Sequence, residues 1–379
     1  MKTAEEQNKK SPGAVKRAAV ITAALLLTVL AVLAVAYWEQ LSAEGLSGLF
    51  SDGEDSGAVQ PYTYETGARQ AFAADGENIA VATTTGLQLL DGSGYTVSRQ
   101  VFSMSQPAVS AGGGVFAFYD VGGTALRVAY ADGEITDMDT DSTIISVSVN
   151  DSGYLTTVTE TAGYKSLVTV YDSELSAVYK WYSGTGYALS AQVSPDNKSL
   201  AVACAGAAGG TVHLFSLSSE TEKASLTSAD ELFLQLHWFS GSRLCAISET
   251  RVLFFDSSGQ ETAEYIFDGK YLTNFQLDGT DFIALHLSRY RTGTAGVLVT
   301  LSSAGSELGS IEVQKDIQSM DVRNERVLVL YSDSLVRYSR TLTESGSSDQ
   351  VLGIKRALLD KKGNAFLLFS YFAERYNFK

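Results

Sequence analysis

The sequence predicts an all-β protein: an eight-bladed β-propeller preceded by a single N-terminal transmembrane helix. Three observations lead to this fold class. A strand–turn–strand step recurs along the chain, no amphipathic helical pattern separates the copies, and one long apolar run stands near the N-terminus. With 4 prolines against 34 glycines, and many Val, Thr, Tyr and Phe residues, the composition favours short pleated strands joined by glycine turns.

The recurring step can be counted by its turn. Its eight copies are ADGEN at Asp75, AGGGV at Gly112, NDSGY at Asp151, SPDNK at Asp196, SGSRL at Gly241, LDGTD at Gly279, VRNER at Asn324 and DKKGN at Lys362. Each copy continues with an apolar run, a bend, a second run closing on a polar turn, and a fourth run. Four short strands in about 40 residues are typical of a propeller blade.

Two other architectures are weighed against eight blades. A ring of seven blades is the alternative if one weak unit is absorbed elsewhere. A two-sheet sandwich is the structural rival, but it does not explain eight recurrences at near-constant spacing. A parallel α/β fold would need helices between the strands, and the sequence contains no such pattern.

The two ends of the repeat region favour a closed ring. The eighth unit stops after its third strand, in AFLLFSYFAERYNFK, whereas QPYTYET at residues 60–66 belongs to no other unit. We expect residues 60–66 to pair beside residues 371–378. That pairing would supply the missing strand and remove the exposed edges of an open ring.

Residues 18–38 form a charge-free apolar run, AAVITAALLLTVLAVLAVAYW. As a helix the run would be about 30 Å long, which is the thickness of a hydrocarbon core. Five cations and two acids precede it in residues 1–17, so the positive-inside rule places this short tail in the cytoplasm and the rest of the chain outside. The alternative is a cleaved signal peptide, with Ala34-Val35-Ala36 as the cleavage site.

The remainder of the chain divides into two expected parts. Residues 39–59 carry Gly, Ser and five acids without a strand pattern, and this composition predicts a flexible acidic linker. Residues 60–379 are the predicted propeller domain, on the outer side of the cell membrane. The formal net charge of −15 argues against a nucleic-acid partner, because phosphate binding needs a basic face.

Three units are longer than the others, and their extra residues fall between the second and third strands. These bends are ETAGYKS, AGAAGG and SRYRTGTAG. Insertions on one face of a repeat protein often mark a binding face. Aromatic side chains next to Arg or Lys are typical of contact hot spots, so we select five candidate partner contacts: Tyr164, Lys165, Arg289, Tyr290 and Arg291.

The stretch VSPDNKSLAVACAGAAGGTVHLFSLSS, residues 193–219, resembles a WD-type or YVTN-type repeat. The Trp-Asp pair of that repeat is missing in every copy, and the nearest steps are VYDS at Asp172 and FFDS at Asp256. With its tail, anchor and repeats, the chain is also similar to an uncharacterised bacterial family of membrane-anchored propellers. That family is known only as a domain of unknown function, so the resemblance implies a fold and no functional residue.

No catalytic or cofactor motif is complete. His213, His237 and His286 lie in strands of different units, without a second His at ligand spacing. The acidic stretch with Asp137, Asp139 and Asp141 begins like a calcium loop, but Ser142 and Ser148 replace the required Gly and Glu, so we expect a solvated loop and leave calcium as the alternative.

Other signatures of chemistry also fail. The chain has no G-x-S-x-G elbow and no P-loop, and the single Trp181 step does not repeat as it does in quinone-binding propellers. Cys204 and Cys245 lie in apolar runs and are expected to be two buried thiols, with a disulfide as the alternative.

The sequence therefore predicts a non-enzymatic module without a cofactor, which binds a protein, peptide or envelope component outside the membrane. The alternative is a propeller enzyme, a hydrolase or lyase that acts on a small molecule or sugar in the central channel. A sensor is a weaker reading, because a tail of 17 residues is too short for a signalling domain. Fold alone does not choose among these roles.

Overall fold

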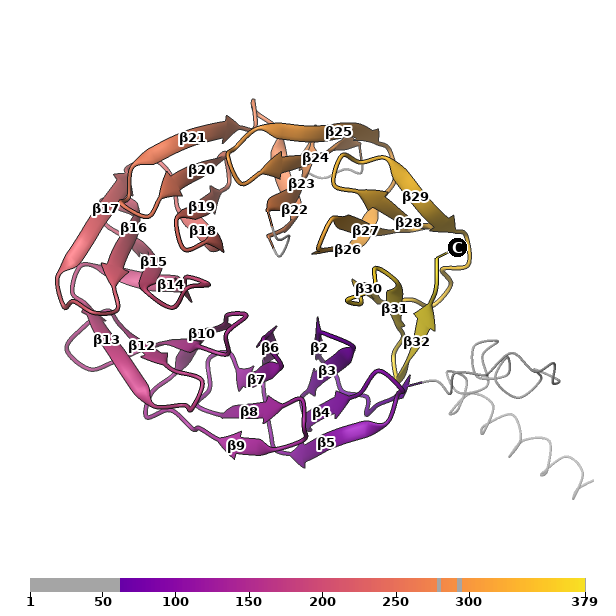
Figure 1. The fold of residues 1–379 in the computed structure, drawn as a ribbon, viewed down its shortest axis with the longest axis horizontal. Coiled ribbons are helices and arrows are strands. Elements are labelled where there is room, and N and C mark those ends of the chain that lie inside the picture. The colour runs from indigo at the N-terminus through magenta and orange to yellow at the C-terminus, as the bar shows by residue number, and fades with distance from the viewer. Residues whose placement is uncertain (1–61, 278–280, 292–294, 379) are drawn as a thin grey trace, which may run out of the picture. The chain divides into compact units, whose positions relative to one another are not determined.

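The computed structural model describes residues 62–277, 281–291 and 295–378. Within these residues, the strands form eight four-stranded antiparallel sheets, arranged as blades around a common centre (Figure 1). The predicted eight-bladed propeller is confirmed, and the seven-bladed and sandwich alternatives are excluded.

Each blade is a meander that starts at the ring centre and ends at the rim. In blades 1 to 4 the strands, from the centre outwards, are β2 (Gln70–Asp75), β3 (Asn78–Thr83), β4 (Gly86–Leu90) and β5 (Thr96–Val101); β6 (Pro107–Gly112), β7 (Val115–Asp120), β8 (Leu126–Tyr130) and β9 (Ile135–Asp137); β10 (Ile144–Val149), β11 (Leu155–Thr159), β12 (Ser166–Tyr171) and β13 (Ala177–Ser183); β14 (Gly186–Val193), β15 (Ser199–Gly206), β16 (Gly209–Ser216) and β17 (Glu222–Ser228).

The second half of the ring repeats this order. In blades 5 to 8 the strands are β18 (Phe233–Ser240), β19 (Arg243–Ser248), β20 (Arg251–Asp256) and β21 (Glu261–Ile266); β22 (Tyr271–Gln276), β23 (Phe282–Ser288), β24 (Gly296–Ser302) and β25 (Glu307–Val313); β26 (Ile317–Arg323), β27 (Arg326–Tyr331), β28 (Leu335–Ser339) and β29 (Glu344–Ser348); β30 (Arg356–Leu359), β31 (Ala365–Leu368), β32 (Phe372–Tyr376) and β1 (Tyr62–Thr63).

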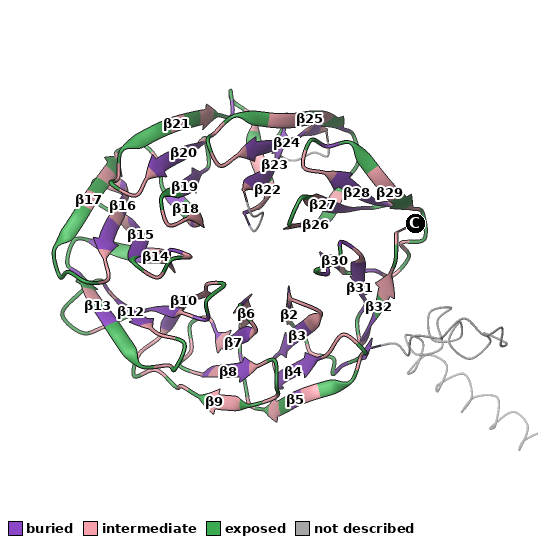
Figure 2. Ribbon diagram, viewed as in Figure 1, coloured by how far each residue is buried: buried purple, intermediate pink, exposed green. Residues whose placement is uncertain are grey.

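The hydrophobic core is divided among the contacts between blades. The described residues contain eight core clusters, and each one joins two neighbouring blades, blade 8 to blade 1 included. The middle strands supply most of these side chains and are buried, whereas the rim strands are largely exposed (Figure 2). Because every blade needs both neighbours to bury its two faces, the core favours a closed ring.

The ring is closed by the N-terminal strand. β1 pairs antiparallel with β32, with Tyr62 opposite Ala373 and Thr63 opposite Phe372, as the sequence predicts. Tyr62 is fully buried, and Tyr64 donates hydrogen bonds from its hydroxyl to the carbonyls of Phe369 (2.5 Å) and Phe372 (2.8 Å). The two ends of the described chain therefore share one sheet, and the ring has no open edge at this blade.

The propeller has two different faces. We call the face that carries the hairpin turns within each blade, between its first and second and its third and fourth strands, the turn face. The loop face carries the bends between second and third strands and the loops that lead into the next blade. Contacts confirm that these two kinds of loop lie together, since the Glu160 amide of one bend donates to the Thr143 carbonyl of an inter-blade loop (2.9 Å).

The turn face is joined from blade to blade by polar contacts. The Gly114 amide donates to Asp75 (2.7 Å) between blades 1 and 2, and the Asn150 side chain donates to the Ser194 carbonyl (3.1 Å) between blades 3 and 4. The Lys361 amide donates to the Gly76 carbonyl (3.2 Å) between blades 8 and 1. The recurring turn residues that identify the repeat thus hold neighbouring blades together.

Acidic residues at the polar turns have a local structural role. The Asp172 carboxylate accepts hydrogen bonds from the amides of Glu174 (3.0 Å) and Ser176 (2.9 Å), and Asp256 does the same with Ser258 (2.8 Å) and Gln260 (3.0 Å). Side-chain acceptors of this kind stabilise tight turns. The Asp residues of VYDS and FFDS are therefore turn residues.

The predicted AGAAGG bend of blade 4 differs in the structure. Most of it extends the β15–β16 hairpin, in which Gly206 pairs with Gly209, and only residues 207–208 form the bend. Gly209 has φ +100°, and a Cβ there would lie 2.0 Å from the Ser228 carbonyl oxygen. Glycine is required at this close approach, so the insertion serves hairpin geometry.

The structure does not test the prediction of a membrane anchor. The apolar run at residues 18–38 and the linker at residues 39–59 lie outside the described residues. Within the described part, no helix has the length and apolar character needed to cross a membrane. The compact unit that contains the strands spans Val59–Lys379.

Candidate functional site

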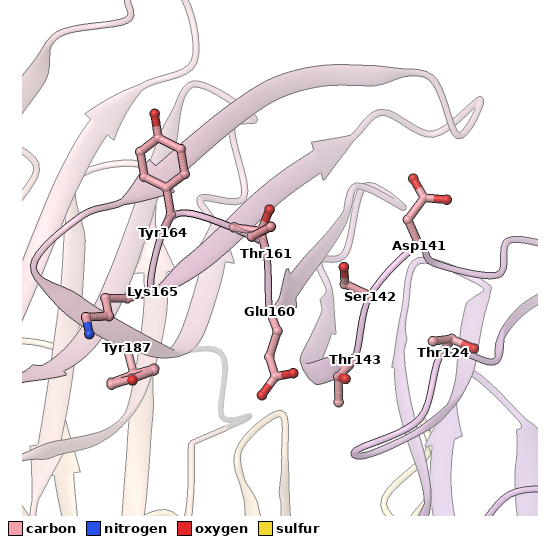
Figure 3. Close-up of a pocket in the computed structure, with 10 residues that line it drawn as sticks. Thr124, Asp141, Ser142, Thr143, Glu160, Thr161, Tyr164, Lys165 and Tyr187 are labelled. Carbon is pink, nitrogen blue, oxygen red and sulfur yellow. The ribbon is translucent and has the colours of Figure 1, made fainter.

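A hollow of about 530 Å³ opens on the loop face over blades 2 to 4 (Figure 3). We call it the loop-face hollow. Three loops and the start of β14 form it: the β7–β8 loop provides Thr124, the β9–β10 loop residues 141–143, the β11–β12 bend residues 160–162 with Tyr164 and Lys165, and β14 provides Tyr187. Residues from three successive blades therefore meet at one place.

Backbone hydrogen bonds hold these loops in position. The Thr140 amide donates to the Thr124 carbonyl (2.9 Å), and the Glu160 amide to the Thr143 carbonyl (2.9 Å). At the other end of the bend, the Lys165 amide donates to the Ser183 carbonyl (2.8 Å). Because each loop is tied to the next by main-chain atoms, the hollow is preformed.

The lining combines carboxylates, hydroxyls, one ammonium and exposed aromatic rings. In Figure 3, Glu160 points between the Lys165–Tyr187 pair and the hydroxyl residues Ser142 and Thr143. The Lys165 ammonium lies over the Tyr187 ring, 5.1 Å from its centroid. This distance is within the range of a cation–π interaction, which fixes the ammonium at one wall of the hollow.

Two tyrosine side chains that line the hollow are accessible to solvent. Tyr164 is 52% exposed and Tyr187 53% exposed. Tyr164 packs against Tyr182, the penultimate residue of β13, with ring centroids 5.0 Å apart. Exposed tyrosines that are held by neighbours offer a large contact surface at a low cost in conformational entropy.

The structure separates the five predicted contact residues into two groups. Tyr164 and Lys165 line the loop-face hollow, as described above. Arg289, Tyr290 and Arg291 lie in the corresponding bend of blade 6, after β23, where Arg289 pairs with Glu312 at 2.6 Å. Both groups lie on the loop face, but they do not form one site.

Sequence reasoning missed part of the lining. Tyr187 lies near the start of an innermost strand, and Thr124 comes from the preceding blade, so neither is close in sequence to Tyr164. Only the repeat could have indicated that these two residues lie near Tyr164. Once the chain is divided into blades, the bend of one unit and the inter-blade loops on either side can be expected to lie together.

The acidic stretch that resembles a calcium loop is occupied by an arginine. Arg127 pairs through Nε with Asp137 (2.9 Å) and through Nη1 with Asp139. The hydrogen bond from Arg127 lowers the pKa of the Asp139 carboxyl. Two of the three carboxylates thus already have a cationic partner, while Asp141 lines the loop-face hollow instead. A calcium ion at this stretch would have to displace the guanidinium.

The histidines remain separate in the structure. His213 contacts Glu222 (2.8 Å, Nδ1 to Oε1) on the rim of blade 4, and His237 packs edge-on against Phe239 in blade 5. His286 is buried in blade 6, where its Nδ1 lies 2.7 Å from the Thr273 hydroxyl and burial lowers its pKa. In residues 62–277, 281–291 and 295–378, no three His, Cys, Asp or Glu side chains are grouped as metal ligands.

The two cysteines and Trp181 pack in or against the core clusters of the propeller. Cys204 and Cys245 are free and buried, in different core clusters. Burial raises the pKa of Cys204 to about 12 and also raises that of Cys245, so neither thiol is poised for nucleophilic chemistry. Trp181 packs between His213 and Phe215 at the contact of blades 3 and 4.

Comparison with known proteins identifies the family. A family model described as a family of unknown function, DUF5711, matches residues 59–351. The chain belongs to this family. No curated protein matches the chain. The predicted similarity to an unknown-function family of propellers is therefore confirmed, and the family brings no assigned activity with it.

Solved structures resemble the chain in fold. The C-terminal WD40 domain of Sif2 has a TM-score of 0.61 at 12% identity, over 84% of this chain and 97% of that one. BamB from Moraxella catarrhalis has a TM-score of 0.53 at 12% identity, over 84% and 96%. The β-propeller domain of Cps50 (Swd1) from Myceliophteria thermophila has 0.52 at 9%, over 72% and 95%. Identities this low establish the shared propeller fold alone.

Proposed function

We propose that this protein is a non-enzymatic binding module, which binds a protein, peptide or other component of the cell envelope through its loop face. The proposal includes a membrane anchor at residues 18–38 and a propeller on the outer side. The other function class that the sequence allows is an enzyme that acts in the central channel.

The distribution of exposed apolar side chains carries the binding proposal. Of the 12 large hydrophobic side chains that are exposed in the described residues, only Tyr95 and Val178 lie toward the turn face. The other 10 lie in the bends, in the inter-blade loops or at strand ends on the loop face: Val101, Tyr164, Tyr182, Tyr187, Leu232, Leu234, Ile266, Tyr271, Tyr290 and Leu352.

This asymmetry has a physical consequence. Single exposed apolar residues are normal on any surface, but their concentration on one face marks an interaction surface. The turn face, by contrast, uses its polar residues to join neighbouring blades, as Asp75 and Asn150 do. One face of the ring therefore serves stability, and the other is left for contact with a partner.

Paired variants test the binding face. The experiment captures the binding partner with the unchanged full-length chain and with variants of it. The variant with Leu234→Asp and Tyr271→Asp on the loop face should no longer capture this partner. The matched pair Tyr95→Asp and Val178→Asp on the turn face should keep it, because all four side chains are 39–68% exposed and tolerate a polar replacement. Equal capture by the two variants, or loss only with the turn-face pair, would exclude the loop face as the binding surface.

The proposed orientation is tested by cysteine labelling. The native thiols are buried and stay unlabelled, so a single cysteine reports its own compartment. We expect a membrane-impermeant maleimide to label Ser173→Cys, on the turn face, in intact cells. Ser11→Cys in the tail should react only after lysis. The reverse pattern, or labelling of both before lysis, would contradict an external propeller.

A further inference from the structure

We propose that the loop-face hollow is a subsite for a neutral saccharide. This inference rests on the proposed function, since it assigns a ligand class to one part of the same face. The juxtaposition that carries it is a carboxylate pair, a group of hydroxyls and a fixed ammonium beside two exposed tyrosine rings.

The hydrogen-bonding groups of the hollow match a polyol. The carboxylates of Asp141 and Glu160 are acceptors, the Lys165 ammonium is a donor, and the hydroxyls of Ser142, Thr143 and Thr161 can do both. In the part of the chain that the structure describes, no hydrogen bond or ion pair joins either carboxylate to another group. A sugar presents several hydroxyls that each donate and accept, so it can satisfy both kinds of group at once.

The arrangement of charges disfavours an ionic ligand. A cation that approached the carboxylates over Tyr187 would meet the Lys165 ammonium, which already covers that ring. An anion that approached Lys165 would meet Asp141 and Glu160, which line the same hollow. An ion of either sign would therefore be repelled by at least one charged group of the hollow, whereas a neutral ligand avoids both repulsions.

The aromatic rings supply the apolar contact that a sugar needs. The C–H groups of a pyranose form an apolar face, which packs on an accessible aromatic ring. Tyr164 and Tyr187 are each about half exposed, and Tyr182 supports the ring of Tyr164. One side of a sugar ring could thus contact tyrosine while its edge hydroxyls reach Glu160 and the hydroxyl residues.

Size and rigidity agree with a short saccharide. The hollow, at about 530 Å³, falls within the range of roughly 300–1,000 Å³ that is usual for small-ligand sites. Its loops are tied by main-chain hydrogen bonds at Thr124, Thr143 and Ser183. A preformed site loses little conformational entropy on binding, which matters for a ligand held mainly by hydrogen bonds.

The test uses the full-length chain in lipid nanodiscs, without sugar-based detergent. Saturation-transfer NMR is recorded with maltose, cellobiose, lactose and N,N′-diacetylchitobiose as probes. We expect saturation transfer to the ring protons of at least one disaccharide, and affinity that changes less than twofold between low and high salt, because a neutral ligand is not screened. Tyr164→Ala and Tyr187→Ala should each weaken this binding by about tenfold.

Two further variants keep the test specific. Tyr290→Ala removes a tyrosine that is 65% exposed on the loop face but lies outside the hollow, and it should bind the disaccharide as the unchanged chain does. Glu160→Gln keeps the size of the side chain and should weaken binding severalfold, because a charge-assisted hydrogen bond becomes a neutral one. Equal thermal unfolding midpoints confirm that the variants are folded.

Several outcomes would overturn the saccharide subsite. They are an absence of transfer to all four disaccharides, or transfer that survives both tyrosine substitutions. Binding of trilysine or inorganic phosphate that depends on Glu160 or Lys165 and falls steeply with salt would assign the hollow to an ionic ligand instead. If no disaccharide binds in the hollow but the loop-face variant still loses its partner, the saccharide subsite is excluded and the proposed binding module is not.

Discussion

At the scale of single residues, Glu231 shows how the loop face is held in shape. Its carboxylate lies in the loop between blades 4 and 5 and accepts hydrogen bonds from Arg251 (Nε, 2.7 Å), Ser248 (2.6 Å) and Thr250 (2.8 Å). The side chain is 7% exposed. Burial raises the pKa of Glu231, but these hydrogen bonds outweigh burial and lower it to about 2.

The shift makes the stability contribution of Glu231 depend on pH. Since the folded-state pKa lies below the unfolded value of 4.5, the contribution is complete above pH 4.5 and is lost as the pH falls toward 2. We expect Glu231→Gln to lower the free energy of unfolding by about 1–3 kcal/mol at pH 7. The difference from the unchanged chain should shrink between pH 4.5 and pH 2.5.

Urea unfolding of the full-length chain across this pH range checks the prediction. Glu220→Gln is the matched control, because Glu220 is exposed on the turn face of blade 4, and its replacement should have little effect. A destabilisation by Glu231→Gln that is the same at pH 7 and at pH 2.5 would show that the charge of Glu231 does not support the loop.

Other residues illustrate what the sequence could and could not predict at this scale. Tyr164 and Lys165 were predictable as contact residues, because an insertion in the repeat marks their bend. The role of Arg127 was not predictable, since a guanidinium in the next strand inward, β8, neutralises a stretch that has the spacing of a calcium loop. Motif spacing does not include charges that arrive from a neighbouring strand.

At the scale of elements, the two-residue strand β1 closes the ring. Tyr64 follows it, is 6% exposed, and stacks edge-on against Phe72 at 5.6 Å. Its hydroxyl bonds two carbonyls of the last blade, and its amide donates to the Tyr371 carbonyl (2.9 Å). One side chain therefore connects blade 8 to the core of blade 1.

Replacement of Tyr64 should open this connection. We expect Tyr64→Ala to lower the free energy of unfolding by about 3–5 kcal/mol, the usual range for loss of a large buried aromatic side chain. Hydrogen exchange should speed up first in β32, because it loses β1, the strand that covers its outer edge. The measurement is thermal unfolding combined with hydrogen exchange.

The control for closure is Tyr95→Ala, which removes a tyrosine that is 68% exposed on the turn face and should leave both measurements unchanged. Faster exchange spread evenly over all eight blades, or an unchanged unfolding midpoint in Tyr64→Ala, would contradict closure by β1.

Closure was predictable because the final unit lacks a fourth strand and residues 60–66 belong to no unit. The shape of the bend in blade 4 was not predictable. In AGAAGG, the glycines permit strand pairing of Gly206 with Gly209 and a tight turn, and composition alone does not separate a longer loop from a longer hairpin.

At the scale of the whole molecule, eight repeats with one core cluster per blade contact explain why a sequence without Trp-Asp pairs forms a propeller. The fold follows from turn spacing and strand pattern, which are local. The loop-face hollow does not, because Thr124, Glu160 and Tyr187 come from three blades and meet only after the ring closes. Fold was thus more predictable than site.

The central claim is that the loop face is the partner-binding face of this chain. The most direct measurement places a photoreactive amino acid, one position at a time, in the full-length protein in cells. Leu234, Tyr271 and Tyr290 report on the loop face, and Tyr95 and Val178 on the turn face. We predict covalent adducts with a common partner from the three loop-face positions and none from the turn-face pair. Adducts from the turn face, or none from any position, would contradict the account.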